Sequence, residues 1–297
     1  MNVHTLDLNF KGTPGVIASY LIPYANSAVL IESGPGATVS ALAAGLASYG
    51  FKPEDVTDLF VTHIHLDHAG AAGWLANQGV TVHVHPRGLP HLADPSRLLA
   101  SAGQIYGAEM DTLWGEMLPV PADRLVPVRD GEVTRIGGLE ILAIDTPGHA
   151  THHHAYLIGD ICFTGDVGGV RLPGPAHIRL PMPPPEFHLE TWKTSSEKLR
   201  QIGAGRVAPT HFGIYPDAGA HFELLAETLA ETAAWLEKTM PGRDPEGLET
   251  EVADWLENRS TAAGLSPEDF RRYEVANPSH TSAWGIARYW KKYRGGL

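Results

Sequence analysis

Short apolar runs rich in β-branched residues alternate with Ala- and Leu-rich runs along the first part of the chain. The stretches "VIASYLIP" (16–23), "SAVLIESG" (27–34) and "VTDLFVT" (56–62) have the composition of strands. The stretches "ATVSALAAGLASYG" (37–50) and "AGAAGWLANQG" (69–79) place Ala and Leu at helical spacing, and each ends at a Gly. Because strands and helices alternate, this pattern predicts a sheet that is covered by helices.

Strands dominate the middle of the chain, after a strand at 80–85 and a helical stretch at about 88–117. The further runs with strand composition are 124–128, 132–137, 139–147, 153–159 and 160–166. A Pro- and Gly-rich segment at 167–188 then precedes a helix at 189–203 and a strand at 206–211. Loops longer than about 15 residues are uncommon in compact domains and are often functional. We therefore expect the 167–188 segment and the 88–117 stretch to form the wall of a substrate site.

The last part of the chain is helical and rich in aromatic residues. The helical stretches are 220–240, 246–260, 266–276 and 280–293. The aromatic residues beyond 244 are Trp255, Phe270, Tyr273, Trp284, Tyr289, Trp290 and Tyr293. Since each buried ring removes about 150–250 Å² from water, we expect a helical extension at 241–297 that packs on a main domain at 1–240. Packing on a second subunit is the alternative, so the protein is expected to be a monomer or a homodimer.

Charge and cysteine content limit the classes of function. The net charge is −12 with neutral histidines, which argues against a nucleic-acid surface because such surfaces are usually basic. No apolar run approaches the roughly 20 residues that cross a bilayer, and the first residues show no secretory signal. Cys162 is the lone cysteine, which fits a reducing cytoplasm. We therefore expect a cytoplasmic protein with a small-molecule substrate and no nucleic-acid or membrane partner.

The stretch "THIHLDHAG" (62–70) carries the densest group of candidate metal ligands. His63 and His65 are two positions apart, so they share one face of an extended chain. Asp67 and His68 are adjacent and cannot point the same way. The simplest arrangement sends the first pair to one metal ion and the second pair to another ion nearby. Imidazole and carboxylate together suit Zn²⁺, Fe or Mn²⁺.

Three later motifs supply further ligands at the ends of predicted strands. They are "TPGHATHHH" with His149, "FTGD" with Asp166 and "PTHFG" with His211. Strand ends are where α/β folds build their sites. The candidate metal ligands are therefore His63, His65, Asp67, His68, His149, Asp166 and His211.

These motifs, in this order, resemble the metallo-β-lactamase-fold superfamily over roughly residues 15–235. The stretch "LIESGPG" resembles a turn of that family with Glu32 and Ser33 in place of Asp and Thr, at a supporting position. The resemblance implies an α/β fold, a four-layer αββα sandwich with the site at one edge between two sheets, so that residues 1–240 would be the catalytic domain.

The resemblance also implies a role for each candidate residue. The first metal would be held by His63, His65 and His149, and the second by Asp67, His68 and His211. Asp166 would bridge both ions. His153 matches a second histidine that supports a ligand by hydrogen bonding, whereas His152 and His154 are expected to be structural or exposed.

Two metal ions about 3.5–4 Å apart acidify a bridging water molecule into a hydroxide nucleophile, and Asp67 can hold or accept its proton. The resemblance therefore implies a dinuclear hydrolase acting on a small ester, thioester, lactone or phosphoester, with two divalent ions, Zn²⁺ first and Fe or Mn as alternatives. The alternative function is a mononuclear iron oxygenase of the persulfide-dioxygenase type. The Tyr that quorum-quenching lactonases carry after the bridging Asp is missing here. Cys162 is expected to be a buried small hydrophobe.

Overall fold

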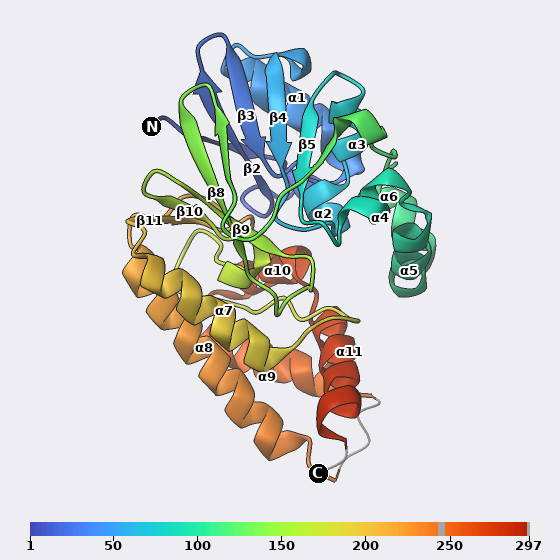
Figure 1. Cartoon of the computed structure of the whole chain (residues 1–297). Helices are drawn as coiled ribbons and strands as arrows, with labels where there is room; N and C mark the ends of the chain where they lie inside the picture. The colour runs from blue at the N-terminus through green and yellow to red at the C-terminus, as the bar shows by residue number, and fades with distance from the viewer. Residues whose placement is uncertain (243–246, 296–297) are drawn as a thin grey trace.

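The strands form two sheets that pack face to face in the computed structural model, which describes residues 1–242 and 247–295 (Figure 1). The first sheet contains, in spatial order, β1 (His4–Asp7), β2 (Ala18–Tyr24), β3 (Ser27–Ile31), β4 (Val56–Phe60), β5 (Thr81–Val84) and β6 (Leu125–Pro127). β1, β2 and β3 pair antiparallel, and the pairs from β3 to β6 are parallel. Parallel strands buried on both faces are near-continuous apolar runs, and this is the pattern of β3 and the end of β4.

The second sheet is largely antiparallel. It contains, in spatial order, β11 (Arg206–Ala208), β10 (Ile161–Phe163), β9 (His154–Ile158), β8 (Leu139–Asp145) and β7 (Val133–Ile136). Only the β10–β11 pair is parallel among these strands. Aromatic side chains fill the space between the two sheets, where Tyr20 meets Phe163 and Phe60 meets Tyr156 edge to face, each pair at 5.3 Å between ring centroids.

Helices cover the outer face of each sheet, so the predicted four-layer αββα arrangement is confirmed (Figure 1). The helices on the side of the first sheet are α1 (Val39–Ser48), α2 (Leu66–Ala69), α3 (Ala72–Ala76), α4 (Leu89–Ala93), α5 (Ser96–Tyr106) and α6 (Met110–Trp114). Those on the side of the second sheet are α7 (Leu189–Ile202), α8 (Ala218–Thr239), α9 (Glu249–Ala262), α10 (Pro267–Ala276) and α11 (Ser279–Tyr289). Short 3-10 turns occupy 10–12, 36–38, 53–55, 107–109, 122–124 and 165–168, and a π-helical turn follows at 290–294. Cys162 is buried in β10 as expected.

Three local predictions differ from the structure. β1 was not predicted, because four residues carry too little pattern to identify a strand. The helical stretch at 88–117 is three helices, since Asp94 is extended before Pro95 and Gly107 and Gly115 have positive φ. The predicted helix at 69–79 contains the shorter α3 (Ala72–Ala76), and a separate helix, α2, precedes it from Leu66 to Ala69. Residue 246, the first of a predicted helix, lies outside the described residues, and α9 begins at Glu249.

The C-terminal helices hold the Pro- and Gly-rich segment in place. The Tyr273 hydroxyl in α10 accepts a hydrogen bond from Leu172 N at 3.1 Å and donates to the His177 carbonyl oxygen at 3.0 Å. The buried Arg179 guanidinium pairs with Glu274 at 2.6 Å. A Cβ on Gly285 of α11 would lie 1.8 Å from the Met182 carbonyl oxygen, so helix and segment touch backbone to backbone. The domain boundary at 240/241 stays a prediction.

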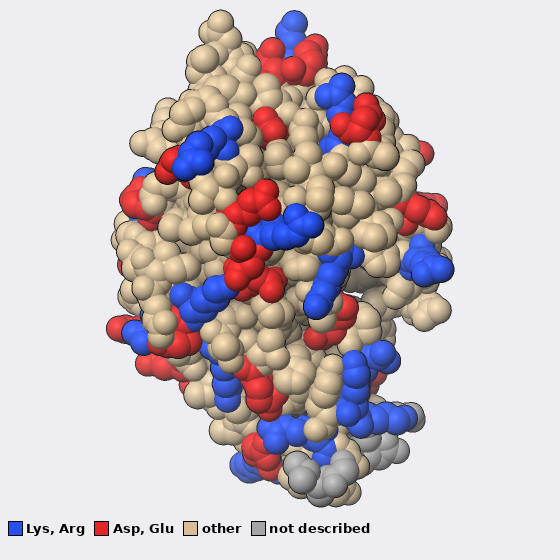
Figure 2. All heavy atoms as spheres, in the orientation of Figure 1, with Lys and Arg blue, Asp and Glu red and all other residues tan. Residues whose placement is uncertain are grey.

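Acidic and basic side chains alternate over much of the face in Figure 2. Among the described residues, no helix combines the length and the apolar character that a membrane crossing requires.

Candidate metal centre

The seven candidate ligands meet at one edge between the two sheets. His63 and His65 lie in the turn between β4 and α2, and α2 itself carries Asp67 and His68. The other three, His149, Asp166 and His211, follow β8, β10 and β11 respectively. Close contacts between their side-chain atoms place all seven in two adjoining groups.

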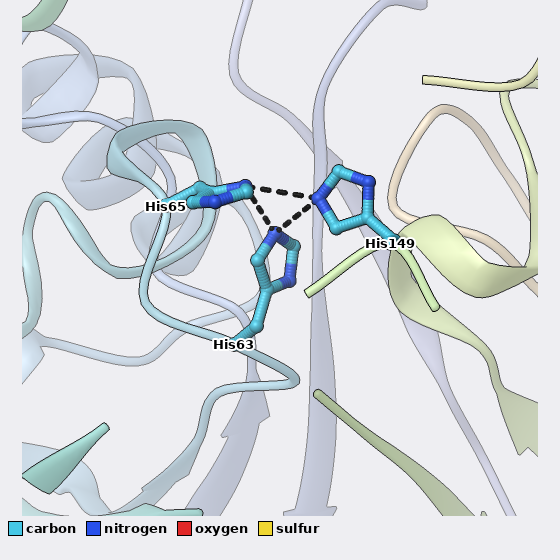
Figure 3. Close-up of side chains that lie close together, drawn as sticks. All are labelled: His63, His65 and His149. Atoms are coloured by element: carbon cyan, nitrogen blue, oxygen red, sulfur yellow. Dashed lines mark hydrogen bonds between the residues drawn. The ribbon is translucent and has the colours of Figure 1, made fainter. Parts of the chain in front are cut away.

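The first group consists of three imidazole nitrogens that face a common point (Figure 3). His65 Nδ1 lies 2.9 Å from both His63 Nε2 and His149 Nε2, and the latter two atoms are 3.2 Å apart. His149 Nδ1 donates to the Pro181 carbonyl oxygen at 2.9 Å, so Nε2 of the neutral ring carries a lone pair. Nitrogen lone pairs that converge in this way cannot satisfy one another, but they can share a cation.

The second group combines imidazole nitrogens with carboxylate oxygens. His211 Nε2 lies 3.3 Å from Asp67 Oδ2, and His68 Nε2 lies 3.2 Å from Asp166 Oδ1. His211 Nδ1 donates to the Val16 carbonyl oxygen at 2.8 Å, so its Nε2 is also bare in the neutral ring. Asp166 faces both groups, because its other oxygen, Oδ2, lies 3.4 Å from His149 Nε2.

This arrangement fits divalent metal ions. His68 Nε2 and Asp166 Oδ1 are buried and have no hydrogen-bond partner among the described residues. A bare ring nitrogen that faces a carboxylate oxygen is repulsive unless a cation or a proton lies between them. Imidazole and carboxylate ligands in this number suit Zn²⁺, and they also accept Fe or Mn²⁺.

Burial sets the protonation of the first group. Burial and, after it, the neighbouring His149 lower the pKa of His65 to about 4. Burial also lowers the pKa of His63 well below its ordinary value, followed by the effect of His68. Both rings are therefore neutral near pH 7, which is the form that binds a metal ion.

The pKa of His68 moves in the opposite direction. Burial acts to lower it, but Asp67, Asp166 and Glu32 together raise it well above the ordinary value. These carboxylates attract positive charge to the position that a second cation would take.

Glu32 orients one ring of each group through hydrogen bonds. Its buried carboxylate accepts hydrogen bonds from His68 Nδ1 at 2.9 Å, Thr210 Oγ1 at 2.9 Å, Thr62 Oγ1 at 2.6 Å and Thr62 N at 3.1 Å. Because the Thr62 hydroxyl proton goes to Glu32, Thr62 Oγ1 accepts from His63 Nδ1 at 3.1 Å. Neither threonine was predicted from the sequence. Their one signal is that each directly precedes a candidate ligand.

His153 is buried beside the ring of His63, at 4.9 Å between ring centroids. Its ring nitrogens contact the Thr146 hydroxyl at 2.8 Å and Val167 N at 3.4 Å, and these are its ring hydrogen bonds within the described part of the chain. Its contact with the site is therefore one of packing. His152 and His154, expected to be structural or exposed, are both buried.

A further His and Asp group lies apart from the site. His85 Nε2 is 3.2 Å from Asp145 Oδ1, and His154 Nε2 is 3.9 Å from the same oxygen. His85 Nδ1 accepts a hydrogen bond from Arg87 N at 3.0 Å. The proton of neutral His85 is therefore on Nε2, facing Asp145, so this nitrogen has no lone pair to offer a metal ion.

A cavity of about 240 Å³ opens directly onto the candidate ligands. Its walls come from α5 and α6, from residues 181–185 and from residues 275–281. The two segments that were expected to form a substrate wall both contribute to it. In Figure 2 the outline of the molecule is hollowed on the side where Figure 1 shows α5 and α11.

Known proteins share the sequence pattern and the fold. The model of the metallo-beta-lactamase superfamily matches residues 12–211. A metallo-beta-lactamase fold-containing protein of Sulfurisphaera tokodaii is 24% identical over 223 residues, or 71% of this chain and 78% of that protein. An atrochrysone carboxyl ACP thioesterase of Aspergillus fumigatus is 29% identical over 164 residues, or 52% of this chain and 42% of the thioesterase. A solved metallo-beta-lactamase family protein of Thermus thermophilus has a TM-score of 0.65 at 21% identity, covering 98% of this chain and 93% of that one.

Proposed function

Because the chain belongs to the metallo-beta-lactamase superfamily, we propose that it is a hydrolase that uses two divalent metal ions, Zn²⁺ first, to cleave a small ester, thioester or lactone. The observation that carries the proposal is the pair of adjoining ligand groups, with Asp166 facing both. When bound, such ions lower the pKa of a shared water molecule and polarise a substrate carbonyl oxygen.

In this proposal the seven side chains divide between the ions as their contacts suggest. His63, His65 and His149 would hold one ion, as their converging nitrogens support. Asp67, His68 and His211 would hold the second ion, and Asp166, which faces both groups, would be available to either ion. Glu32 and Thr62 keep the lone pairs of His63 and His68 directed at the site.

Asp67 is proposed to orient the attacking water molecule by accepting a hydrogen bond from it. Burial acts to raise the pKa of Asp67, but His68 and His211 outweigh it and lower the pKa to about 2. The group is therefore a carboxylate at neutral pH and accepts hydrogen bonds. Its side chain is 18% exposed and lines the cavity, whereas that of Asp166 is 5% exposed.

The thioester class has the best support. The relative from Aspergillus fumigatus is named as a thioesterase, and its match covers half of this chain. A mononuclear iron oxygenase would use His63, His149 and Asp166 at its one ion and would leave Asp67, His68 and His211 without an ion to hold. The complete second group of Asp67, His68 and His211 therefore favours a dinuclear hydrolase.

Metal analysis of two variants tests the proposal. The purified protein should contain two divalent ions per chain. His63→Ala and His211→Ala should each lose about one equivalent and abolish metal-dependent hydrolysis of a panel of esters and thioesters. A His211→Ala variant that keeps both ions and its full rate would contradict the dinuclear assignment, and one iron per chain in the parent protein would favour the oxygenase.

A further inference from the structure

The cavity beside the candidate ligands has largely apolar walls. Its contributing side chains include Leu98, Ala102, Ile105, Leu113, Val275 and Ala276. Pro183, Pro184 and Pro185 form a further side. Binding sites gain most of their affinity from burying apolar surface and a few placed polar groups. The candidate ligands and a few other polar side chains, among them Ser101, Asn277 and Thr281, supply the polar groups here, so the apolar part of the wall suits a hydrocarbon group.

Charge in the cavity argues against an anionic substrate. Of the described residues that line it, apart from the candidate ligands, Lys11 and Glu109 carry a formal charge, and their charges are opposite. Recognition of a phosphate or a carboxylate relies on Arg or Lys side chains and on bidentate hydrogen bonds. A single Lys accompanied by a Glu does not provide this, and burying an unpaired anion in the apolar part would be unfavourable.

The walls are held rigidly, so the cavity exists before a substrate enters. Trp114 packs edge to face on Tyr106 at 5.0 Å and stacks on Phe10 at 5.6 Å. On the opposite side, Gly285 fits directly against the Met182 carbonyl oxygen and fixes the adjoining prolines. A preformed apolar cavity loses little conformational entropy on binding.

The size of the cavity limits the group that it takes. Its volume is about 240 Å³, below the roughly 300–1,000 Å³ of sites that bind drug-sized ligands. A short or medium straight chain fits such a space, whereas a fused polycyclic group does not.

We infer that this cavity binds the apolar acyl chain of a neutral ester or thioester, whose carbonyl group lies at the metal end, and that α5 sets the chain length that is accepted. The inference rests on the proposed hydrolase function and names its substrate class. Ala102 is the residue of α5 that limits the chain length, because it is small, 9% exposed and lies on the cavity wall.

A chain-length series tests the inference with the metal-loaded protein. The substrates are p-nitrophenyl esters of straight-chain acids from acetate to decanoate, and one ester with a terminal carboxylate. The kcat/KM should rise about fourfold for each added methylene until the cavity is full, a factor that corresponds to about 0.8 kcal/mol per buried CH₂. The ester with a terminal carboxylate should be at least tenfold poorer than its uncharged counterpart.

Two variants should shift the preferred chain length in opposite directions. Ala102→Phe fills the cavity and should shorten the optimum, whereas Leu98→Ala enlarges it and should lengthen the optimum. Both should keep the metal content of the parent protein. Gln104→Phe is the matched control, because Gln104 is exposed on the same helix and does not line the cavity.

A binding readout separates failure of this inference from failure of the proposed function. Straight-chain fatty alcohols should displace a fluorescent apolar probe from the parent protein with affinity that rises with chain length, and Ala102→Phe should remove that trend. Ester hydrolysis that is independent of chain length, or faster for the ester with the terminal carboxylate, overturns the inference and leaves the hydrolase intact. Absence of any ester or thioester hydrolysis with both ions bound overturns the hydrolase. In that case the acyl-chain assignment is also wrong. Probe displacement that depends on chain length would then show only that the cavity binds apolar molecules.

Discussion

Replacing Glu32 by Gln should weaken metal binding although Glu32 is not itself a candidate ligand. The Glu32 side chain is fully buried and accepts four hydrogen bonds, of which three reach Oε1. Gln can keep those three with its amide oxygen. Its amide N–H₂ group then faces the backbone N–H of Thr62, so a buried donor loses its acceptor.

The magnitude follows from these contacts. Hydrogen bonds to a charged group contribute about 1.5–3 kcal/mol each, and an unsatisfied buried donor costs about 1–3 kcal/mol. Since three of the four bonds persist in weaker, neutral form, the loss should be about 2–4 kcal/mol in the free energy of unfolding of the metal-free protein. Removing a partner that orients a metal-binding histidine lowers metal affinity by about 10–100-fold. The ion beside His68 should lose more affinity, because His68 bonds to Glu32 directly. The ion beside His63 should lose less, because His63 bonds to Glu32 through Thr62.

Competition with a chromophoric chelator measures the affinity of both ions, and thermal unfolding of the metal-free protein measures stability. Ser33→Ala is the matched control. It removes a buried hydrogen bond to the His68 carbonyl oxygen at 2.9 Å but leaves the histidine ring untouched. If Glu32→Gln bound both ions as tightly as the parent protein, or lost no more affinity than Ser33→Ala, the orienting role of Glu32 would be wrong.

Two further predictions concern packing and pH. Gly285→Ala should lower the free energy of unfolding by about 1–3 kcal/mol and raise KM, because the new Cβ would meet the Met182 carbonyl oxygen. The control is Gly219→Ala in α8, where a new Cβ has open space. This control should be neutral or stabilising in the same thermal melts. Stability should also fall as the pH drops from about 6.5 towards 4, because burial lowers the pKa of His177 to about 3 and that of His221 to about 4. Histidines with lowered folded-state pKa values bind protons more readily in the unfolded chain, so acid favours unfolding. Thermal melts of His221→Gln at pH 7 and pH 5 should show a smaller difference than those of the parent protein, and an equal or larger difference would contradict this account.

The sequence identified the residues whose chemistry is distinctive and missed those whose role depends on position. His63 and Asp166 stand out because of their motifs and because strands end beside them. The carbonyl oxygens of Val16 and Pro181, which set the tautomers of two histidines, have no sequence signal because every residue has a carbonyl group. The use of Nδ1 by His65, where its neighbours present Nε2, depends on the path of the turn.

The overall architecture can be predicted from the sequence, but some of its details cannot. The alternation of strands and helices and the metal-ligand motifs together indicate two sheets covered by helices. The break of the 88–117 stretch at Pro95 had a local signal that the overall helical composition concealed. The contribution of residues 275–281 to the cavity depends on tertiary packing of α10 and α11 against a segment about 100 positions earlier, as the 101-residue separation of Leu172 and Tyr273 illustrates.

Helices α10 and α11 hold residues 170–185 in place, and both helices are made late in synthesis on the ribosome. All seven candidate ligands are synthesised by residue 211, well before Tyr273 and Gly285 emerge. A nascent chain therefore contains all seven candidate ligands before the residues that complete the cavity wall are made. The residues of α10 and α11 that line the cavity are the last part of its wall to be synthesised. A protease that removed those helices would be expected to change what the protein accepts before it changed what metal the protein holds.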